Sequence, residues 1–571
     1  MTELNFKGKE FVFNHHLSVP FRPLIVHPEK GIGEPSLDGN LIIHGDNLHA
    51  LKALLPLYAG KIDCIFIDPP YNTGNEGWCY NDNVNAPMIK EWLDANPVGI
   101  EDGLRHDKWC AMMWPRLRLL FNLLSENGAM FVCIDDNELY HLRLILDEIS
   151  GNPSNWIGTI VWKNATDNNP TRIAIEHEYI ACFSKNKDLV DKVWKSVLSG
   201  VKKILIDIGN DFIKQYPEND ERQKEYTKWF RENRSQLWPL DRYKYIDAEG
   251  IYTGSQSVHN PGREGYRYDV LHPKTGLPCK QPLLGYRFPE ETMRNLLDRD
   301  KILFGDNHNK IVEIKVYAKD YLEKLPSVIE LDGRTAAYEL REIFPDRNKA
   351  FDNPKPTQII DKILSFSTSN ESVILDSFAG SGTTAHAVLN LNREDGGARR
   401  FILVECEDYA DSLTRERVSR VIRGIAAARN DVLKQGLGGA FTYCTLGNPV
   451  DFDKLLTGDA LPPYEGIGAA LFHMATNRAF DPTTVREDDC YLGEADGQHV
   501  WLIYRPDLEW LKSADAALTL TRAREFAETA PDERHLVFAP ARYVSQKILS
   551  EQNIPVEFVP LPFALYRVDR S

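Results

Sequence analysis

The stretch SVILDSFAGSGTTAHAVL (372–389) decides the fold that we expect for this chain. Apolar residues up to Asp376 predict a buried strand. Gly380 and Gly382 predict a tight turn, since glycine adopts backbone conformations that other residues avoid. Residues with helical spacing follow at once, and RRFILVECE (399–407) reads as the next strand. This alternation of strand and helix predicts an α/β fold with a parallel sheet.

The same alternation runs through residues 41–189. KIDCIFID (61–68) and AMFVCID (129–135) are apolar on both faces, as buried parallel strands are. Residues 107–126 have helical spacing, and we expect that helix to end at Gly128. Further strands are predicted at LIIHG (41–45), WIGTIVW (156–162) and EYIACF (178–183).

Other segments break this pattern and divide the chain into five parts. Residues 190–345 are rich in aromatic side chains and are interrupted by glycine, proline and asparagine clusters, which indicates a loop-rich insert. GLGGA (436–440) indicates a flexible joint. The predicted parts are an irregular extension at 1–40, α/β segments at 41–189 and 346–435, the insert at 190–345, and a small α/β domain at 436–571.

Composition excludes several classes of protein. The 571 residues include 67 basic and 83 acidic ones, for a net charge of −16, so any contact with nucleic acid must use a local basic surface. No run approaches the ~20 apolar residues of a membrane-spanning helix, and the first residues lack a secretory signal. The nine cysteines form no Cys-x-x-Cys pair, so we expect neither a zinc site nor a disulfide framework. The chain therefore reads as a reduced, cytoplasmic protein without a membrane partner.

The glycine turn after Asp376 predicts a site for a nucleoside-containing cofactor. Glu405 ends the next strand, where a carboxylate can accept hydrogen bonds from two ribose hydroxyls. A dinucleotide remains an alternative, as do glycines that serve packing alone. A phosphate-binding P-loop is excluded, because no lysine follows the last glycine. Asp376 would repel phosphate and attract a cation, so the ammonium and sulfonium of S-adenosylmethionine suit the site better.

The tetrapeptide Asp68-Pro69-Pro70-Tyr71 directly follows a predicted buried strand. Its prolines fix the backbone and lack amide donors, so the turn presents acceptors, the Asp68 carboxylate and the Pro69 carbonyl, beside the Tyr71 ring. Acceptors next to a stacking ring fit an exocyclic amine on a planar base. Hydrogen bonds from that amine would localise its lone pair and let it attack a sulfonium methyl, largely through positioning and electrostatics. The alternative is a proline-rich connector without chemistry.

Two motifs of the chain together resemble those of the β-class DNA amino-methyltransferases. They are DPPYNTG (68–74) and, much later, DSFAGSGTT (376–384). Within that class the chain is most similar to the modification (Mod) subunit of type III restriction-modification systems. The features that carry this closer similarity are GDNLHAL (45–51), HEYI (177–180) and NPKP (353–356).

The resemblance implies a Rossmann-like S-adenosylmethionine-dependent methyltransferase core, circularly permuted so that the catalytic motif precedes the cofactor motif. It also implies that residues 190–345 are a target-recognition domain. The activity would be site-specific transfer of a methyl group to the N6 amine of a flipped adenine in double-stranded DNA, leaving S-adenosylhomocysteine, with no metal. In the family that the chain resembles, aspartate at the position of Asp68 favours adenine N6 over cytosine N4. The chain is somewhat short for a Mod subunit, so a solitary N6 or N4 methyltransferase is the alternative.

The resemblance also assigns roles to residues at matching positions. Asp68, Pro69, Pro70 and Tyr71 would bind and activate the flipped base. The predicted cofactor-binding residues are Asp46, Lys355, Asp376, Phe378, Ala379, Gly380, Gly382, Thr383 and Glu405.

Four of the residues in these motifs have two interpretations each. Asp46 is either a cofactor-side acid or the N-cap of a helix. Lys355 touches the amino-acid end of the cofactor or caps the helix that begins near 358. His177 and Glu178 could border the base pocket, although structural roles are commoner for such residues beside an apolar strand.

Contacts with double-stranded DNA are predicted in the insert at 190–345, where basic residues lie among aromatic ones. Arginine and lysine can read guanine edges or hold phosphates, and such contacts must offset the cost of flipping a base. The candidates are Arg231, Arg234, Arg242, Lys244, Arg263 and Arg267. Most of the aromatic residues would form the core of the insert. The domain at 436–571 would serve homodimerisation or docking of a helicase-nuclease (Res) subunit, unless it is a stabilising appendage.

Three other functions are less consistent with the motifs. Enzymes that methylate RNA or a protein glutamine commonly have asparagine first in the tetrapeptide and the cofactor motif ahead of it, the reverse of the order here. Both motifs look intact, which speaks against a DNA-binding subunit without turnover. A dinucleotide oxidoreductase would leave DPPYNTG without a role. The methyltransferase hypothesis requires that the loop after residue 67 and the loop near 380 share one cavity.

Overall fold

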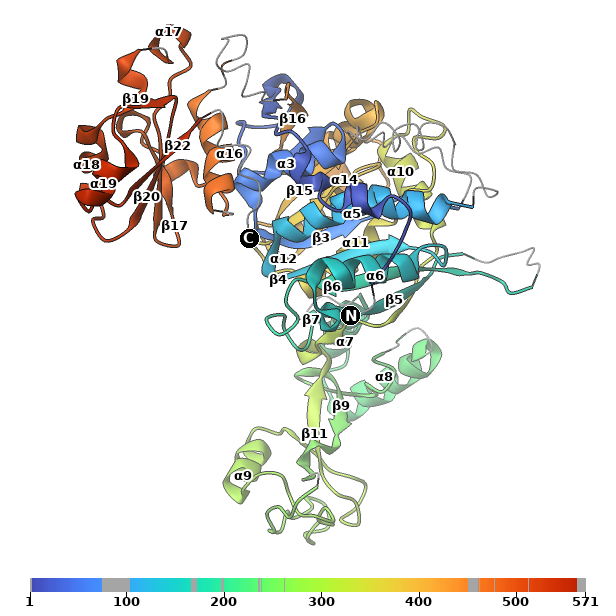
Figure 1. Ribbon diagram of the computed structural model, residues 1–571. Helices are drawn as coiled ribbons and strands as arrows, with labels where there is room; N and C mark the ends of the chain where they lie inside the picture. Colours follow the sequence, from blue (N-terminus) through green and yellow to red (C-terminus); the bar gives the residue numbers. More distant parts are fainter. Residues whose placement is uncertain are drawn as a thin grey trace. The chain divides into compact units, whose positions relative to one another are not determined.

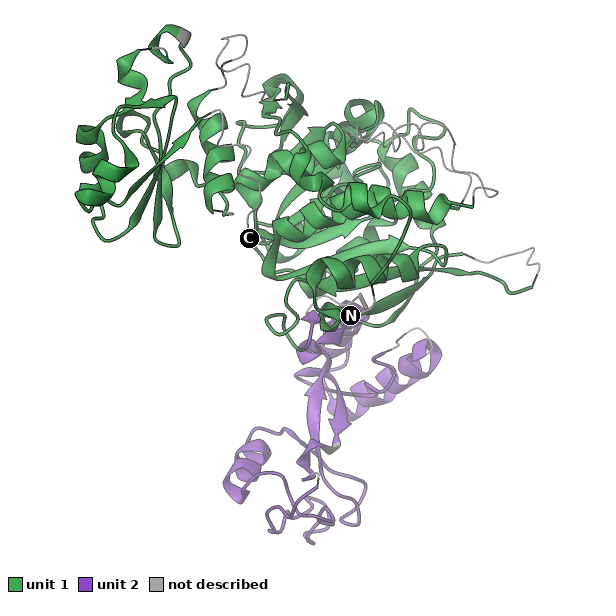
Figure 2. Ribbon diagram, in the orientation of Figure 1, with its two compact units in different colours: residues 1–192, 326–571 green, residues 193–325 purple. Residues whose placement is uncertain are grey.

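The computed structural model (Figure 1) describes residues 3–73, 103–165, 172–196, 200–234, 237, 239–260, 262–449, 461, 463–476, 478–511 and 513–561. Gly74, the last residue of the DPPYNTG motif, lies outside these ranges. The chain forms two compact units, residues 1–192 with 326–571 and residues 193–325 (Figure 2).

The described part of the first unit is built around a ten-stranded sheet, in the order β1-β16-β2-β15-β14-β3-β4-β6-β5-β13. The strands are β1 (Leu24–Val26), β2 (Leu41–His44), β3 (Ile62–Ile67), β4 (Leu124–Ile134), β5 (Trp156–Lys163), β6 (His177–Ser184), β13 (Val328–Glu330), β14 (Val373–Asp376), β15 (Arg400–Glu405) and β16 (Thr442–Leu446). From β16 to β4 neighbouring strands are parallel, and β6 runs antiparallel to β4 and β5. The fold is therefore the predicted α/β architecture with a mainly parallel central sheet.

Helices cover both faces of this sheet. On one face, α3 (Asn47–Tyr58), α5 (Arg105–Leu123) and α6 (Leu139–Ser150) share a hydrophobic cluster with alternate residues of the strands, such as Ile65 and Leu375. On the other face, where Cys64 approaches Ser367, lies α11 (Thr357–Ser367), which packs against α12 (Thr383–Asp395). Burial on two faces explains why the central strands are apolar throughout.

The most consequential pairing joins two segments that are far apart in the sequence. β3 and β14 are adjacent and parallel, with Ile374 opposite Cys64 and Leu375 opposite Ile65. From this pair, β4 continues the sheet to one side and β15 to the other. Ligands of open α/β sheets bind at such a reversal of strand order, beyond the carboxyl ends of the strands. Both predicted motifs begin at this edge.

The unit 193–325 has its own antiparallel sheet, in the order β10-β11-β9-β8. Its strands and longer helices are β8 (Tyr245–Asp247), β9 (Gly250–Ser255), β10 (Ile302–Leu303), β11 (Glu313–Tyr317), α7 (Gly200–Gln215), α8 (Asn219–Asn233) and α9 (Glu290–Asp298). Tyr226, Phe230 and Tyr243 are buried in one of its hydrophobic clusters. These aromatic residues are core residues, which was the expectation for most of them.

Three predicted boundaries differ from the structure. Residues 326–345 belong to the first unit, since β13 pairs with β5, so the insert ends earlier than predicted. β1 lies in the predicted irregular extension and pairs with β16, which itself follows the predicted joint. The domain predicted from 436 therefore starts too early, because β16 completes the central sheet. The helix predicted over 107–126 ends at Leu123, and Gly128 lies within β4.

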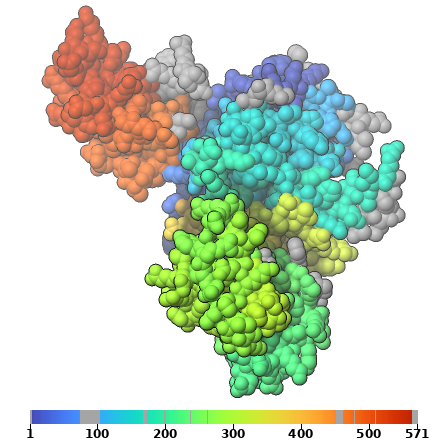
Figure 3. Space-filling model, turned by 90° about the horizontal axis from the view of Figure 1, so that it is seen from below, coloured from blue at the N-terminus to red at the C-terminus, as the bar shows by residue number. Residues whose placement is uncertain are grey.

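The C-terminal part has a second sheet, in the order β17-β18-β20-β22. Its elements include α16 (Tyr464–Thr476), β17 (Tyr491–Ala495), β18 (Gln498–Leu502), α18 (Leu520–Glu528), β20 (Arg534–Ala539), α19 (Gln546–Glu551) and β22 (Val556–Pro560). Trp501 stacks on Phe526 at 4.2 Å between ring centroids inside one of its hydrophobic clusters. In the space-filling view the C-terminal elements, coloured orange to red, form a closely packed body (Figure 3). No helix of the described ranges is long and apolar enough to cross a membrane.

The central strand pair is part of the buried core, which predicts how core and surface substitutions differ in their effect on stability. Ile374 in β14 is fully buried, so Ile374→Ala should lower the free energy of unfolding by about 2–5 kcal/mol through lost burial and a residual cavity. Ile175 is 60% exposed, and the matched change Ile175→Ala should stay within about 0.5 kcal/mol. Urea denaturation followed by circular dichroism measures both. Equal effects of the two substitutions would contradict the assigned core.

Candidate active site

One cavity lies beyond the carboxyl ends of β3 and β14, with a volume of about 1320 Å³. Asp68, Pro69, Pro70 and Tyr71 line it from the first motif. From the second motif and the following strand it is lined by Asp376, Phe378, Ala379, Gly380, Thr383 and Glu405. Cavities of roughly 300–1,000 Å³ hold one drug-sized ligand, so this cavity has room for a cofactor together with part of a second molecule. The requirement that the two loops share one cavity is met.

Two hydrogen bonds with residues of α5 hold the turn that follows β3. Trp109 Nε1 donates to the Pro70 carbonyl at 2.7 Å. Asn72 is fully buried with φ at 61°, and its side-chain amide donates to the Arg105 carbonyl at 3.2 Å. A left-handed conformation at a non-glycine residue costs free energy, so these contacts hold the turn in a shape that the chain would otherwise avoid.

The Tyr71 hydroxyl lies at the centre of a charged group. It is 2.8 Å from Asp68 Oδ1 and 2.9 Å from Glu178 Oε2, and it accepts from Lys355 Nζ at 2.7 Å. A hydroxyl has one proton, so Tyr71 donates to one carboxylate at a time. Burial and the neighbouring carboxylates raise the pKa of Tyr71 well above its ordinary value, so it remains a donor at neutral pH.

Lys355 pairs with both carboxylates of this group. Its ammonium lies 3.2 Å from Asp68 Oδ1 and 2.9 Å from Glu178 Oε2, over the rings of Tyr71 and Trp162 at 4.9 and 5.4 Å. Burial alone would lower the pKa of Lys355, but the carboxylates outweigh it and raise that pKa above its usual value. The side chain is therefore charged. Burial raises the pKa of Asp68 above its usual value, and the ammonium of Lys355 opposes that shift.

The position of Lys355 was only partly predicted. Pro356, and not Lys355, occupies the N-cap position of α11, so Lys355 does not cap that helix. Its contact with a cofactor remains a prediction, while its pairing with Asp68 was not foreseen. Glu178 lines the cavity, as one of its two interpretations had it, whereas His177 pairs with the Tyr179 hydroxyl at 2.9 Å. No local sequence pattern indicates the Lys355–Asp68 pair, because 287 positions separate the two residues in the printed numbering.

Three backbone amides fix the orientation of the Glu405 carboxylate beside the glycine turn. Gly380 has φ at 52°, and its amide donates to Glu405 Oε2 at 2.7 Å. The amides of Cys406 and Glu407 donate to Glu405 Oε1 at 2.9 and 3.1 Å. A carboxylate has about four lone-pair positions, so three amide donors leave acceptor capacity for a ligand hydroxyl. This geometry fits the predicted role of Glu405 toward a ribose.

Asp376 is buried at the start of the same turn. Its Oδ1 accepts from the Phe378 amide at 3.0 Å, and its Oδ2 accepts from the Thr384 hydroxyl at 2.6 Å. Burial raises the pKa of Asp376 to about 7, although these hydrogen bonds oppose the shift. A nearby cation would favour the ionised form, as expected for a group that receives an ammonium.

Two predicted cofactor residues lie outside the cavity lining, Asp46 and Gly382. Asp46 caps α3, because its Oδ1 accepts from the His49 amide at 3.2 Å, so the N-cap interpretation fits the structure. Gly382 has φ at 79° and is the N-cap residue directly before α12. An added Cβ would lie 3.2 Å from the Thr414 carbonyl oxygen, so this glycine is needed for the backbone shape of the turn.

Sequence reasoning missed the support beneath the glycine turn. Arg417 is 1% exposed and donates to the hydroxyls of Ser381 and Thr383 at 2.8 and 2.7 Å. It also pairs with Glu339 at 3.2 Å. These contacts tie the turn to α13 (Glu416–Arg423). The only signal in the sequence was an arginine-rich helix, which is more often a solvated face.

The predicted DNA contacts all lie in the unit 193–325. Each of these side chains is exposed, namely Arg231, Arg234, Arg242, Lys244, Arg263 and Arg267. Exposure leaves them available to phosphates or bases, and their role remains a prediction. Among the described residues one further group, His106, Glu138 and His141, has the chemistry of metal ligands. The sequence, with no Cys-x-x-Cys pair, had predicted no metal site.

Comparison with known proteins agrees with this site. Residues 62–415 match the DNA methylase family, and the chain belongs to that family. It is 51% identical over 382 residues to the type III restriction-modification enzyme EcoP15I Mod subunit of Escherichia coli, covering 65% of this chain and 58% of that protein. It is 30% identical over 465 residues to the StyLTI Mod subunit of Salmonella typhimurium, covering 76% and 65%. The chain thus spans less than two thirds of either Mod subunit.

For a relative from another type of system, the match covers a larger share of the relative's length. The type II methyltransferase M.KpnI of Klebsiella pneumoniae is 30% identical over 375 residues. That match covers 63% of this chain and 79% of the relative.

The raised pKa of Asp376 predicts how the ligand-free protein responds to pH. A carboxyl group with a higher pKa in the folded chain stabilises the fold at low pH, and this contribution is lost as the pH rises from about 4 through about 7. Relative to Asp376→Asn, the wild-type chain should lose about 2 kcal/mol of unfolding free energy between pH 5 and pH 8. Urea denaturation at both pH values tests this, and identical pH slopes in the two proteins would contradict it.

Proposed function

We propose that this chain is a site-specific DNA methyltransferase that uses S-adenosylmethionine to methylate N6 of a flipped adenine in double-stranded DNA. The observation that supports this most is the single cavity lined by both motifs. Membership of the DNA methylase family supports the reaction class. The cofactor fits the donor set, because Glu405 offers acceptors to ribose hydroxyls and Asp376 offers a carboxylate to an ammonium.

The residues of the cavity have separate roles in the proposed methyl transfer. The bound cofactor supplies the electrophilic methyl group on its sulfonium. Asp68 accepts a hydrogen bond from the exocyclic amine of the base, while Tyr71 stacks on the base beside it. Lys355 and Tyr71 both contact Oδ1 of Asp68, which leaves Oδ2 for the amine. Asp68 can then accept a proton from the methylated nitrogen, since burial raises its pKa while Lys355 opposes that shift and supports the ionised form before transfer.

We further propose that the chain acts as the modification subunit of a type III restriction-modification system. The 51% identity to the EcoP15I Mod subunit supports this assignment. A homodimer, a helicase-nuclease partner and a target-recognition role for residues 193–325 belong to the same proposal. The alternative is a solitary adenine-N6 or cytosine-N4 methyltransferase. The match to M.KpnI, a type II methyltransferase, over 79% of its length keeps an assignment outside the type III systems open.

Expression of the chain alone in a methylation-free host tests the proposal. Single-molecule sequencing of the host DNA should show N6-methyladenine confined to one sequence motif, on one strand if the target is asymmetric. Methylation at cytosine N4 would move the assignment to the alternative. Unmodified DNA in cells that contain folded, S-adenosylmethionine-binding protein would contradict methyl transfer to DNA.

Asp68→Ala should abolish methyl transfer, with a loss of at least about 10²–10³-fold in kcat, because the amine loses its acceptor. Binding of S-adenosylmethionine should change little, since Asp68 belongs to the base side of the cavity. Radiolabelled methyl transfer and equilibrium dialysis measure the two effects. Retained methylation in this variant would refute the role of Asp68.

Lys355→Met should lower kcat by about 10–100-fold, because the neutral side chain no longer orients Asp68 or favours its charge. Lys355→Arg should recover part of the activity by restoring the cation. Lys547 is exposed on α19 and does not line the cavity, so Lys547→Met serves as the matched control with unchanged kcat. A full rate in Lys355→Met would show that the ion pair is only structural.

A further inference from the structure

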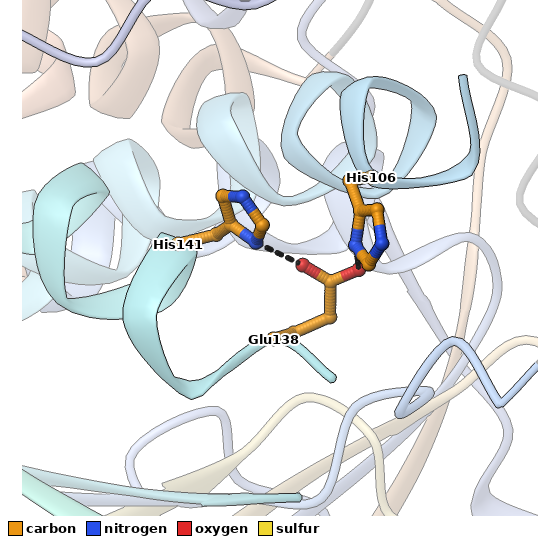
Figure 4. A group of neighbouring side chains, drawn as sticks. All are labelled: His106, Glu138 and His141. Carbon is orange, nitrogen blue, oxygen red and sulfur yellow. Dashed lines mark hydrogen bonds and ion pairs between the residues drawn. The ribbon is translucent and has the colours of Figure 1, made fainter. Parts of the chain in front are cut away.

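Two imidazoles converge on one buried carboxylate beside the catalytic turn (Figure 4). His106 lies in the first turn of α5, and Glu138 and His141 lie at the start of α6. Nδ1 of His106 is 2.7 Å from Glu138 Oε1, and Nδ1 of His141 is 2.8 Å from Glu138 Oε2. The rings flank the carboxylate from two sides, and the potential ligand atoms all lie within 4.8 Å of one another.

This group has the composition and the exposure of a transition-metal site. Two imidazole nitrogens and one carboxylate suit zinc and similar borderline ions better than magnesium or calcium, which prefer oxygen alone. Glu138 and His141 are three positions apart and therefore share one side of the helix start. The side chain of Glu138 is 0% exposed, while those of His106 and His141 are 36% and 34% exposed. An ion could thus enter from solvent onto a preformed, desolvated carboxylate.

We propose that His106, Glu138 and His141 bind a divalent transition-metal ion of the zinc class, with a fourth position left for water. The present separations are those of hydrogen bonds. Ligand atoms around a tetrahedral zinc ion, with bonds of ~2.0–2.2 Å, are about 3.3 Å apart. Binding therefore requires the two imidazoles to move apart from the carboxylate by about 0.5 Å each, which side-chain rotation provides.

The proton balance of this exchange follows from Arg105. Its Nε donates to Nε2 of His106 at 3.2 Å, so His106 carries its ring proton on Nδ1 in the ion-free protein. Metal binding at Nδ1 of His106 moves that proton to Nε2 and breaks the contact with Arg105. The Nδ1 proton of His141, which faces Glu138 Oε2, must likewise pass to Nε2 or to solvent. Arg105 therefore competes with the ion, and its removal should tighten binding several-fold.

The site is coupled to the turn that carries Tyr71. The side-chain amide of Asn72 also donates to Glu138 Oε1. Groups that hydrogen-bond to a metal-binding carboxylate fix its orientation, so a bound ion would restrain Asn72 and the end of the turn. This consequence for the turn rests on the proposed function. The metal site itself does not, because its test measures binding alone.

Zinc binding to the full chain provides the test. Chain without an affinity tag, stripped with a chelator, is titrated with zinc chloride against a chromophoric indicator. We expect one tight site per chain, at least about 10-fold weakened in His106→Ala and in His141→Ala. His27 is similarly exposed and also lies beside a glutamate, so His27→Ala is the matched control and should leave affinity unchanged. Unchanged affinity in both ligand variants, or no stoichiometric zinc in the wild type, would overturn the proposal.

Two further measurements test the zinc site without relying on the histidine variants, which could fold poorly. X-ray absorption spectra of the zinc-loaded wild-type chain should show imidazole nitrogens and carboxylate oxygen at about 2.0–2.2 Å. Arg105→Ala leaves all three ligands in place and should bind zinc more tightly than the wild type. Spectra with oxygen ligands only, or weaker binding in Arg105→Ala, would contradict the assignment.

Discussion

The molecule depends on the parallel pairing of β3 with β14. These strands are separated by more than 300 positions in the sequence, yet Leu375 lies opposite Ile65, so their carboxyl ends meet at one edge of the sheet. A polypeptide leaves each strand in a turn, and the two turns here are the DPPY and glycine motifs. Their proximity is therefore a property of the sheet. The order of the motifs along the chain does not matter, provided that the strands pair in this way.

Charge organises the cavity at this edge. Asp68, Glu178, Asp376 and Glu405 bring carboxyl groups into a partly desolvated space, and Lys355 compensates on the side of the DPPY turn. On the side of the glycine turn, Asp376 responds to burial with a pKa of about 7. A cationic ligand would relieve that cost, whereas a phosphate would increase it. The electrostatics thus favour S-adenosylmethionine over a dinucleotide, the choice that the motif alone left open.

Sequence reasoning succeeded where chemistry is local. Buried strands, the glycine turn and the N-cap option for Asp46 follow from neighbouring residues. It failed where partners are distant: β1 is short and half-exposed, so only its pairing with β16 reveals it as a strand. Lys355 and Asp68, like His106 and Glu138, meet only because of tertiary packing. Their spacing in the sequence contains no periodicity that would indicate contact.

The decisive measurement is a crystal structure with a cognate DNA duplex and sinefungin, a non-reactive analogue of S-adenosylmethionine, because it shows whether both turns act on one flipped base. We expect an extruded adenine whose N6 lies within ~2.6–3.2 Å of an Asp68 carboxylate oxygen, facing the analogue beside the glycine turn. The ribose of the analogue should contact Glu405. An adenine that remains stacked in the duplex, or an analogue bound away from the turn that follows β14, would contradict this expectation.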